Sequence, residues 1–190
     1  MNKEKPRVIT SGEKALTIGA VEKLLDVIND IRDETLLRLA ITGGLRREDI
    51  VKIFIKDIDF DNCAVTFYQH KKKNIHTVFL PDSTMLSLEK LIRVQKRLKS
   101  PYLFPSSKPK RHLSSRTAYN ILQKYLKIAG LPSIPFHALR STCVKLCQAR
   151  GWSPEQSAKH IDDTLTTIQR HYTTPSEEER KETAKEKPIL

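Results

Sequence analysis

Two segments of the sequence carry residues that could act on a phosphate ester. Arg46 follows Thr42-Gly43-Gly44-Leu45, where glycines let the backbone approach a ligand closely. His137 and Arg140 stand three residues apart at the start of an expected helix, hence on one face. An imidazole can transfer a proton near neutral pH, and a guanidinium can bind a phosphate in bidentate fashion. These types suit metal-free phosphodiester cleavage, which needs cations around the phosphate, an acid and a nucleophile.

Each of these signals also has a plainer interpretation when it is taken alone. An arginine after a helix C-terminus is often a solvated residue that the helix dipole favours. The pattern His137-Ala138-Leu139-Arg140 is short enough to occur by chance. The argument therefore depends on the combination of motifs.

The charge of the chain favours a polyanionic partner. Among 190 residues, 34 Lys and Arg outweigh 22 Asp and Glu, giving a formal charge of +12. Nucleic acid is the partner that this balance favours, and a soluble protein that is merely basic is the alternative. The length suits one domain with a tail.

The cysteines indicate neither a disulfide framework nor a metal site. Cys63, Cys143 and Cys147 are an odd number in a chain with no apolar signal segment or membrane span, which favours a reducing compartment. Cys143 and Cys147, with His137 or His160, are conceivable metal ligands. Because the chain has no CxxC pair, core packing is the favoured interpretation, and we expect no metal and no cofactor.

The hydrophobic pattern predicts a mainly α-helical α+β domain with a small antiparallel sheet near the front. Residues 1–15 read as a linker or tail, 16–175 as the folded domain, and 176–190 as a charged tail. The expected elements are a helix from Ile18 through Ile31 capped by Thr17, a second after Asp33, a short helix over 48–54, strands around 65–67 and 75–80, and helices over 83–98, from Ser114 or Ser115, over 137–150, from Ser153, and over 164–172.

Read in order, five motifs resemble the tyrosine recombinase (integrase) family. The chain gives TGGLRRED, a lysine-rich turn HKKKN ahead of VFLP, HALR, Gly151-Trp152-Ser153, and QRHYT near the C-terminus. The family signature consists of an Arg, a hairpin Lys, HxxR, a His or Trp, and a C-terminal Tyr. The resemblance spans nearly all of 16–175, and it implies the catalytic-domain fold of that family.

The resemblance assigns a catalytic role to each matching position. The residues are Arg46, Lys71, His137, Arg140 and the nucleophile Tyr172. Lys72 and Lys73 adjoin Lys71. Because the register of a lysine-rich turn is soft, the position of the catalytic lysine within it is the least firmly fixed of these assignments. The competing tyrosines Tyr119 and Tyr125 lie on a helix face typical of core packing.

Residue 163 departs from the family pattern. The family usually has a His or Trp there as a donor to the phosphate, and this chain has Asp163. An ionised carboxylate accepts hydrogen bonds but cannot donate them. His160 and His171 lie nearby without matching the position. We expect Asp163 to pair with an arginine such as Arg140 and to orient it.

The resemblance implies cleavage and rejoining of double-stranded DNA through a 3′-phosphotyrosyl intermediate. The expected active form is a homo-oligomer, a tetramer on DNA. The expected location is the cytoplasm, at the host nucleoid. Integration of a viral or plasmid genome is one expected use. The expected DNA-binding residues are Arg46, Lys71, Lys72, Lys73, Lys108, Lys110, Arg111 and Arg140. Alternatives are a type IB topoisomerase and a non-enzymatic DNA-binding protein on the same fold.

Overall fold

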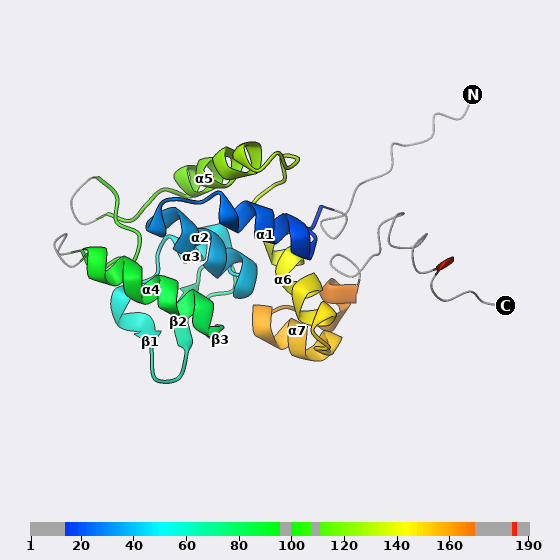
Figure 1. Ribbon diagram of the computed structural model, residues 1–190. Helices are drawn as coiled ribbons and strands as arrows, with labels where there is room; N and C mark the ends of the chain where they lie inside the picture. The colour runs from blue at the N-terminus through cyan, green and yellow to red at the C-terminus, as the bar shows by residue number, and fades with distance from the viewer. Residues whose placement is uncertain (1–13, 96–99, 108–110, 170–183, 186–190) are drawn as a thin grey trace, which may run out of the picture.

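Helices form most of the described chain, and a small sheet is inserted near its front (Figure 1). The computed structural model describes residues 14–95, 100–107, 111–169 and 184–185. The helices are α1 (Ile18–Asp26), α2 (Ile31–Thr42), α3 (Arg47–Ile50), α4 (Asp82–Gln95), α5 (Ser115–Ile128), α6 (Ala138–Ala149), α7 (Pro154–Ile161) and α8 (Leu165–Thr167), with a 3-10 turn η1 (Ile55–Asp57). The strands are β1 (Ile58–Asp59), β2 (Ala64–Gln69) and β3 (Asn74–Phe79). The predicted mainly helical α+β class is confirmed. None of the helices in the described ranges is long and apolar enough to cross a membrane.

The prediction of one helix from Ile18 through Ile31 is wrong. α1 ends earlier, and Ile31 begins α2. The side chain of Asp30 caps α2 by accepting a hydrogen bond from the backbone N–H of Asp33 at 3.0 Å. The apolar period continues across the break because Ile28 and Ile31 both pack against the same core. A period alone therefore did not reveal the cap that divides the two helices.

The other predicted helix starts agree with the structure. Thr17, Ser114 and Ser153 each cap a helix through a side-chain oxygen, and Ser153 forms a reciprocal capping box with Gln156. The helix expected over 48–54 is α3, which spans only Arg47–Ile50. The expected helix over 83–98 is α4 as far as Gln95, and 96–99 lie outside the described residues. Of the helix expected over 164–172, the structure describes α8 and the residues to 169.

The three strands form one antiparallel sheet in the order β1-β2-β3. Val65 pairs with Val78 in the β2–β3 register. Val65, Phe67 and Gln69 are buried on one face of β2, which follows the two-residue period of a strand. The turn at residues 70–73 closes where the backbone N–H of Lys73, at φ 55°, donates to Gln69 O at 2.8 Å. This hairpin carries the lysine-rich segment.

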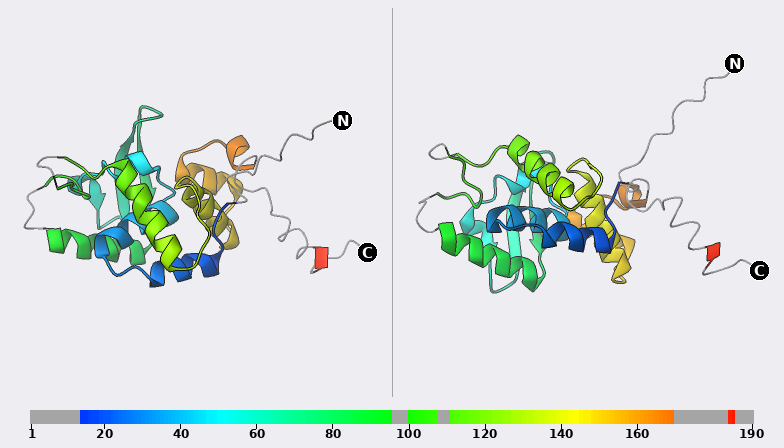
Figure 2. Two further views of the ribbon diagram at one scale, coloured as in Figure 1. Left: turned by 90° about the horizontal axis from the view of Figure 1, so that it is seen from above. Right: turned by 45° about the horizontal axis from the view of Figure 1, so that its top comes forward.

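α2 runs through the centre of the main core. Its residues Leu36, Leu37 and Leu39 are fully buried, and it packs against α4, α5 and α6. A second, smaller core joins α6 to α7 and the residue after α8. It consists of Cys143, Val144, Ala158, Ile161 and Ile168. Figure 2 shows α6 to α8 grouped at one end of the molecule, with the sheet and α4 toward the other. The predicted site residues come from both groups, because Lys71 lies in the β2–β3 turn and Arg140 lies on α6.

Candidate active site

Four residues predicted from three separate motifs line one cavity of about 640 Å³. Arg46 follows α2, Lys71 lies in the β2–β3 turn, and His137 and Arg140 lie at the start of α6. Three cations and an imidazole at one concave surface favour a bound anion. The structure therefore brings these predicted residues together.

Arg46 reaches the cavity because the chain turns sharply after α2. Gly44 adopts φ +60°, and a Cβ there would lie 2.5 Å from Cγ2 of Ile161. Glycine at this position lets α7 pack directly against the turn. Arg46 is then extended at the start of α3, and its Nη1 donates to Oε1 of the buried Gln69 at 2.9 Å. The sheet thus holds the first arginine.

Arg140 is 3% exposed and ties three segments together. Its Nη1 donates to Gly44 O at 2.6 Å. Its Nη2 lies 3.3 Å from Asp162 O and 3.2 Å from Asp163 Oδ2. Its Nε is buried and has no acceptor among the residues that the structure describes. Arg140 thereby links the turn after α2 to the junction after α7.

Asp163 pairs with Arg140, as the sequence analysis expects. Burial raises the pKa of Asp163, but the Thr164 backbone N–H and the Arg140 guanidinium lower it more, so the pKa lies below the ordinary value. The carboxylate is ionised at neutral pH and accepts from the arginine. It stands beside the arginine as an acceptor and not as a donor to an anion.

His137 lies among cations, and although its surface is exposed, the protein around it removes part of its hydration. Burial lowers the pKa of His137, Arg140 and Arg46 lower it further, and Asp163 opposes them. The net shift is downward, so the imidazole is neutral at pH 7. A neutral imidazole can accept a proton from a nucleophile.

The lysine-rich turn divides its three lysines between different surroundings. Lys71 lines the cavity. Lys72 turns to the end of α7, where its Nζ lies 2.6 Å from Asp162 O. Lys73 is exposed at the left-handed position that closes the turn. Of the three lysines, Lys71 is the one that lines the cavity together with the two arginines.

Several predicted residues lie outside the described chain. These are Tyr172, His171, Lys108 and Lys110. Arg111 is described and exposed. The competing Tyr125 is 1% exposed, and its hydroxyl donates to Asp33 Oδ2 at 3.2 Å, as expected of a core residue. Tyr119 packs against the core as well, but it also lines the cavity.

Comparison with known proteins decides the family. A model of the phage integrase family matches residues 14–179. The chain belongs to the phage integrase family. It is 31% identical over 150 residues to the tyrosine recombinase XerA of Pyrococcus furiosus, covering 77% of this chain and 52% of that protein. It is 30% identical over 169 residues to XerA of Saccharolobus solfataricus, covering 87% of this chain and 55% of the relative. The chain thus spans about half the length of these curated relatives.

Solved structures confirm the integrase-family fold. A crystal structure of XerA recombinase superposes with a TM-score of 0.81 at 16% identity, covering 98% of this chain and 68% of that one. XerH recombinase in a post-cleavage complex with its palindromic difH substrate superposes with a TM-score of 0.77 at 19% identity, covering 95% of this chain and 53% of that one. The sequence-based prediction of a tyrosine recombinase catalytic-domain fold is confirmed.

Reasoning from sequence missed polar residues that surround the predicted ones in this integrase-family domain. Gln69 holds Arg46, and Asp49, 3% exposed, receives the backbone N–H of His70 at 3.3 Å. Burial raises the pKa of Asp49, against the lowering effects of the His70 N–H and Arg46. Asp49 is the last residue of the TGGLRRED motif and was given no role in the sequence analysis. The alternation of β2 places Gln69 on the buried face, and this was the signal available for it.

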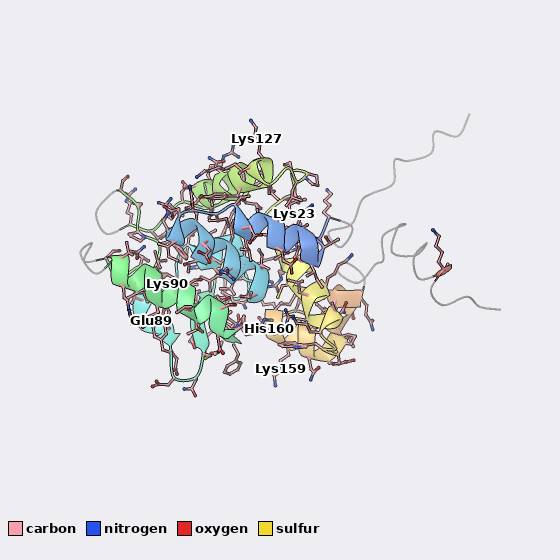
Figure 3. All side chains as sticks on the ribbon, in the orientation of Figure 1. Lys23, Glu89, Lys90, Lys127, Lys159 and His160 are labelled. Atoms are coloured by element: carbon pink, nitrogen blue, oxygen red, sulfur yellow. The ribbon has the colours of Figure 1, made fainter. Side chains whose placement is uncertain are left out.

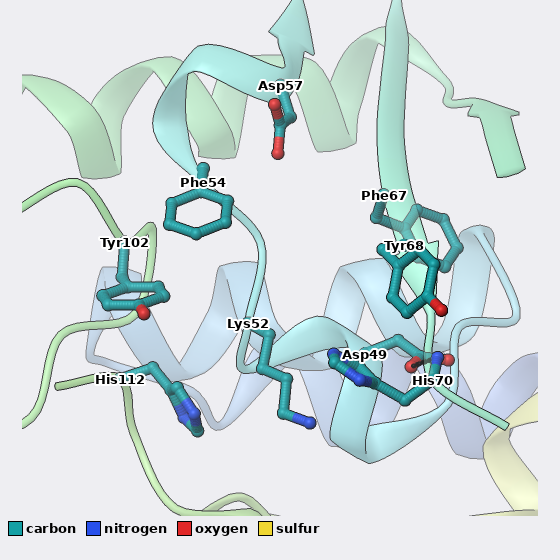
Figure 4. Close-up of a pocket in the computed structure, with 9 residues that line it drawn as sticks. All are labelled: Asp49, Lys52, Phe54, Asp57, Phe67, Tyr68, His70, Tyr102 and His112. Atoms are coloured by element: carbon teal, nitrogen blue, oxygen red, sulfur yellow. Dashed lines mark hydrogen bonds between the residues drawn. The ribbon is translucent and has the colours of Figure 1, made fainter. Parts of the chain in front are cut away.

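A second cavity, of about 350 Å³, adjoins the first (Figure 4). It shares Asp49 and His70 with the first cavity. On its far side Phe54 and Tyr102 stack with ring centroids 4.8 Å apart, and His112 meets Tyr102 edge-on. These residues come from distant segments with no shared motif, so the sequence offered no signal for this cavity.

The cysteines considered as metal ligands do meet His160. The ligand atoms of Cys143, Cys147 and His160 lie within 4.8 Å of one another, and His137 is not in the group. Cys143 Sγ and His160 Nε2 both direct a hydrogen bond to Thr42 O, at 3.3 and 2.9 Å. Cys143 also belongs to the second core. The group thus joins α6 and α7 to the end of α2.

Proposed function

We propose that this chain is the catalytic domain of a site-specific tyrosine recombinase, which cleaves and rejoins double-stranded DNA through a covalent bond to Tyr172. The observation that carries the proposal is the convergence of Arg46, Lys71, His137 and Arg140 on one cavity. The curated relatives named tyrosine recombinases support it. No metal or cofactor takes part in the proposed reaction.

The two arginines bind the scissile phosphate in the proposed mechanism. Arg46, held by Gln69, contacts a nonbridging oxygen. Arg140 lines the same cavity, and its Nε has no protein acceptor among the described residues. Negative charge that develops in the transition state is stabilised by donors already fixed in place.

Proton transfer accompanies both bond changes. The Tyr172 oxygen attacks phosphorus and passes its proton to the neutral His137, while the bond from phosphorus to the 5′-oxygen breaks. Lys71 protonates that oxygen, giving a free 5′-hydroxyl. A 5′-hydroxyl then attacks the phosphotyrosyl bond, the protons return, and the tyrosine is released. Because the phosphotyrosyl link retains the energy of the phosphodiester, no other energy source is needed.

Asp163 orients Arg140 in this scheme and does not bind the phosphate. The 3.2 Å contact between the two side chains is the basis for this assignment. The carboxylate also accepts the backbone N–H of Thr164 at 3.0 Å, so the junction after α7 fixes its position.

Trapping tests the proposal. A suicide duplex, nicked so that the cleaved strand end diffuses away, should leave DNA covalently attached to the protein on a denaturing gel, and peptide mapping should locate the link at Tyr172. A protein that binds this duplex but never forms an adduct would be a binding module on the integrase fold. Relaxation of supercoiled plasmid with no strand exchange between sites would instead indicate a topoisomerase.

The assembly and its use belong to the same proposal. We propose a tetramer on DNA, in the cytoplasm, with Arg111, Lys108 and Lys110 among the DNA contacts. Because the curated relatives are Xer recombinases, resolution of a plasmid with two target sites should be assayed beside integration of a viral or plasmid genome. Multi-angle light scattering of the protein with a two-site duplex would measure the number of protomers.

A further inference from the structure

The tip of the β2–β3 hairpin is fastened to the end of α7. Lys72 Nζ donates to Asp162 O at 2.6 Å and lies 3.0 Å from Asp162 Oδ2. On β3, the strand that follows the turn, His76 Nε2 donates to His160 O at 2.9 Å. Figure 3 shows His160 and the exposed Lys159 on α7. These contacts join segments more than eighty residues apart in the chain.

The backbone at Asp162 is shaped to receive two cations. It ends α7 in the left-handed conformation, at φ 50° and ψ 66°. In this conformation its carbonyl oxygen accepts from Lys72 and also lies 3.3 Å from Arg140 Nη2. The next residue, Asp163, pairs with the same arginine. The lysine turn and the arginine therefore share an acceptor.

The charge at Asp162 persists at neutral pH. Burial raises the pKa of Asp162, but Lys72, Asn74 and His76 together lower it more, so the pKa lies below the ordinary value. The side chains of Lys72 and Asp162 are 34% and 28% exposed, so solvent screens the pair only in part.

We propose that Lys72 and Asp162 form a latch that positions Lys71, the neighbouring residue in the turn. The inference rests on the proposed function, in which Lys71 is the general acid. Lys71 lines the cavity while Lys72 points to α7, so fixing Lys72 restricts the backbone that carries Lys71. Lys72 thus acts through Lys71 as a positioning residue and is not itself a DNA contact. The proposal thus differs from the expectation that Lys72 binds DNA, and the dependence of DNA affinity on salt distinguishes the two.

A change of leaving group distinguishes a variant that weakens the general acid from one that loses a phosphate contact or unfolds. A suicide duplex with sulfur in place of the bridging 5′-oxygen releases a thiolate, which leaves without protonation. Variants that weaken the general acid should therefore be slow on the oxygen substrate and recover on the sulfur substrate. Variants that lose a phosphate contact or unfold should be slow on both.

The variants are Lys72→Ala and Asp162→Asn, and the measurement is the single-turnover rate of adduct formation. Asparagine tolerates positive φ, so Asp162→Asn keeps the backbone and removes the charge. We expect each to lower the rate on the oxygen substrate about tenfold, a fraction of what a general acid contributes, and to come close to the unmodified protein on the sulfur substrate. The double variant should be no slower than either single one, and Lys72→Arg should retain the rate.

Two controls make the result decisive. Lys159→Ala removes an exposed lysine from α7 and should match the unmodified protein on both substrates. Lys71→Ala should show a larger loss with the same recovery. If Lys71→Ala is slow and recovers while Lys72→Ala and Asp162→Asn are unaffected, or are equally slow on both substrates, the latch is wrong. If the unmodified protein forms no adduct, or Lys71→Ala is not rescued, the proposed function or the role of Lys71 is wrong.

Discussion

Arg140 both supports the fold and faces the candidate site. Its guanidinium donates to the turn after α2 and to the junction after α7, so little of it is exposed. A side chain held by several protein acceptors cannot adjust freely to a ligand, and its donors are fixed before the ligand arrives. Residues around it therefore affect the reaction through its orientation, and Asp163 is the nearest example.

Substitution of Asp163 should separate orientation from direct contact. We expect Asp163→Ala to slow cleavage modestly, because Arg140 keeps its other acceptors, and Asp163→His to preserve or improve the rate by supplying a donor. Arg140→Ala should cost about a hundredfold or more. Single-turnover rates on one nicked duplex measure all three. If both Asp163 variants are as inactive as Arg140→Ala, the carboxylate acts directly in catalysis.

Tyr172→Phe should abolish adduct formation and leave noncovalent affinity for DNA nearly unchanged, because only the nucleophilic oxygen is removed. Denaturing gels and a parallel binding titration make the measurement. An adduct formed by the Phe variant would show that another residue, such as the cavity-lining Tyr119, is the nucleophile.

Stability should fall on mild acidification. Burial is the largest cause lowering the pKa of both His137 and His160. The unfolded chain binds protons more readily at these sites, so the stabilisation present above about pH 6.5 is lost as the pH falls toward the folded values. Chemical denaturation between pH 7.5 and 5.5 measures it, and His160→Gln should flatten the dependence. An unchanged slope in that variant would contradict the assignment.

At the scale of elements, α7 packs closely against the turn that follows α2. Gly44 admits Ile161 against its backbone, while Gly130, also at positive φ, meets nothing within 4 Å. The two glycines therefore allow strain in the backbone to be separated from a clash between elements.

Gly44→Ala should lower the free energy of unfolding by about 2–4 kcal/mol, combining the left-handed penalty with overpacking. Gly130→Ala should cost only the backbone penalty, about 1–2 kcal/mol. Urea denaturation of both proteins gives the difference. Equal losses would mean that α7 yields to the added methyl group at no cost.

The sequence placed some of these elements and residues better than others. Arg46, His137 and Arg140 were predictable because each lies in a local motif at a helix boundary. Lys71 was assigned from the family resemblance, and it lines the cavity. The contact of Lys72 with the end of α7 was not predicted, because its partner lies in a distant segment. Asp162 and Gln69 were missed because their partners lie in distant segments. The break before α2 was missed because Ile28 and Ile31 continue one apolar period across it.

For the whole molecule, a net charge of +12 should appear as a strong dependence of DNA affinity on salt. Each neutralised phosphate contributes a slope of about 0.9 in a plot of log affinity against log salt. Arg46→Ala should reduce the slope by about one contact, whereas Lys72→Ala should leave it unchanged because Lys72 is paired with Asp162. Fluorescence anisotropy over a salt series measures the slopes. A nearly flat dependence would rule out a surface that follows the DNA backbone.

The left-handed backbone at Asp162 limits which amino acids can replace it during mutational drift. Asparagine and glycine accept this conformation readily, but β-branched and bulky residues do not. Of these replacements, asparagine keeps a polar side chain, and neither keeps the negative charge beside Lys72. In a saturation library screened for recombination, position 162 should therefore return a far narrower set of residues than the exposed position 159 on the preceding helix.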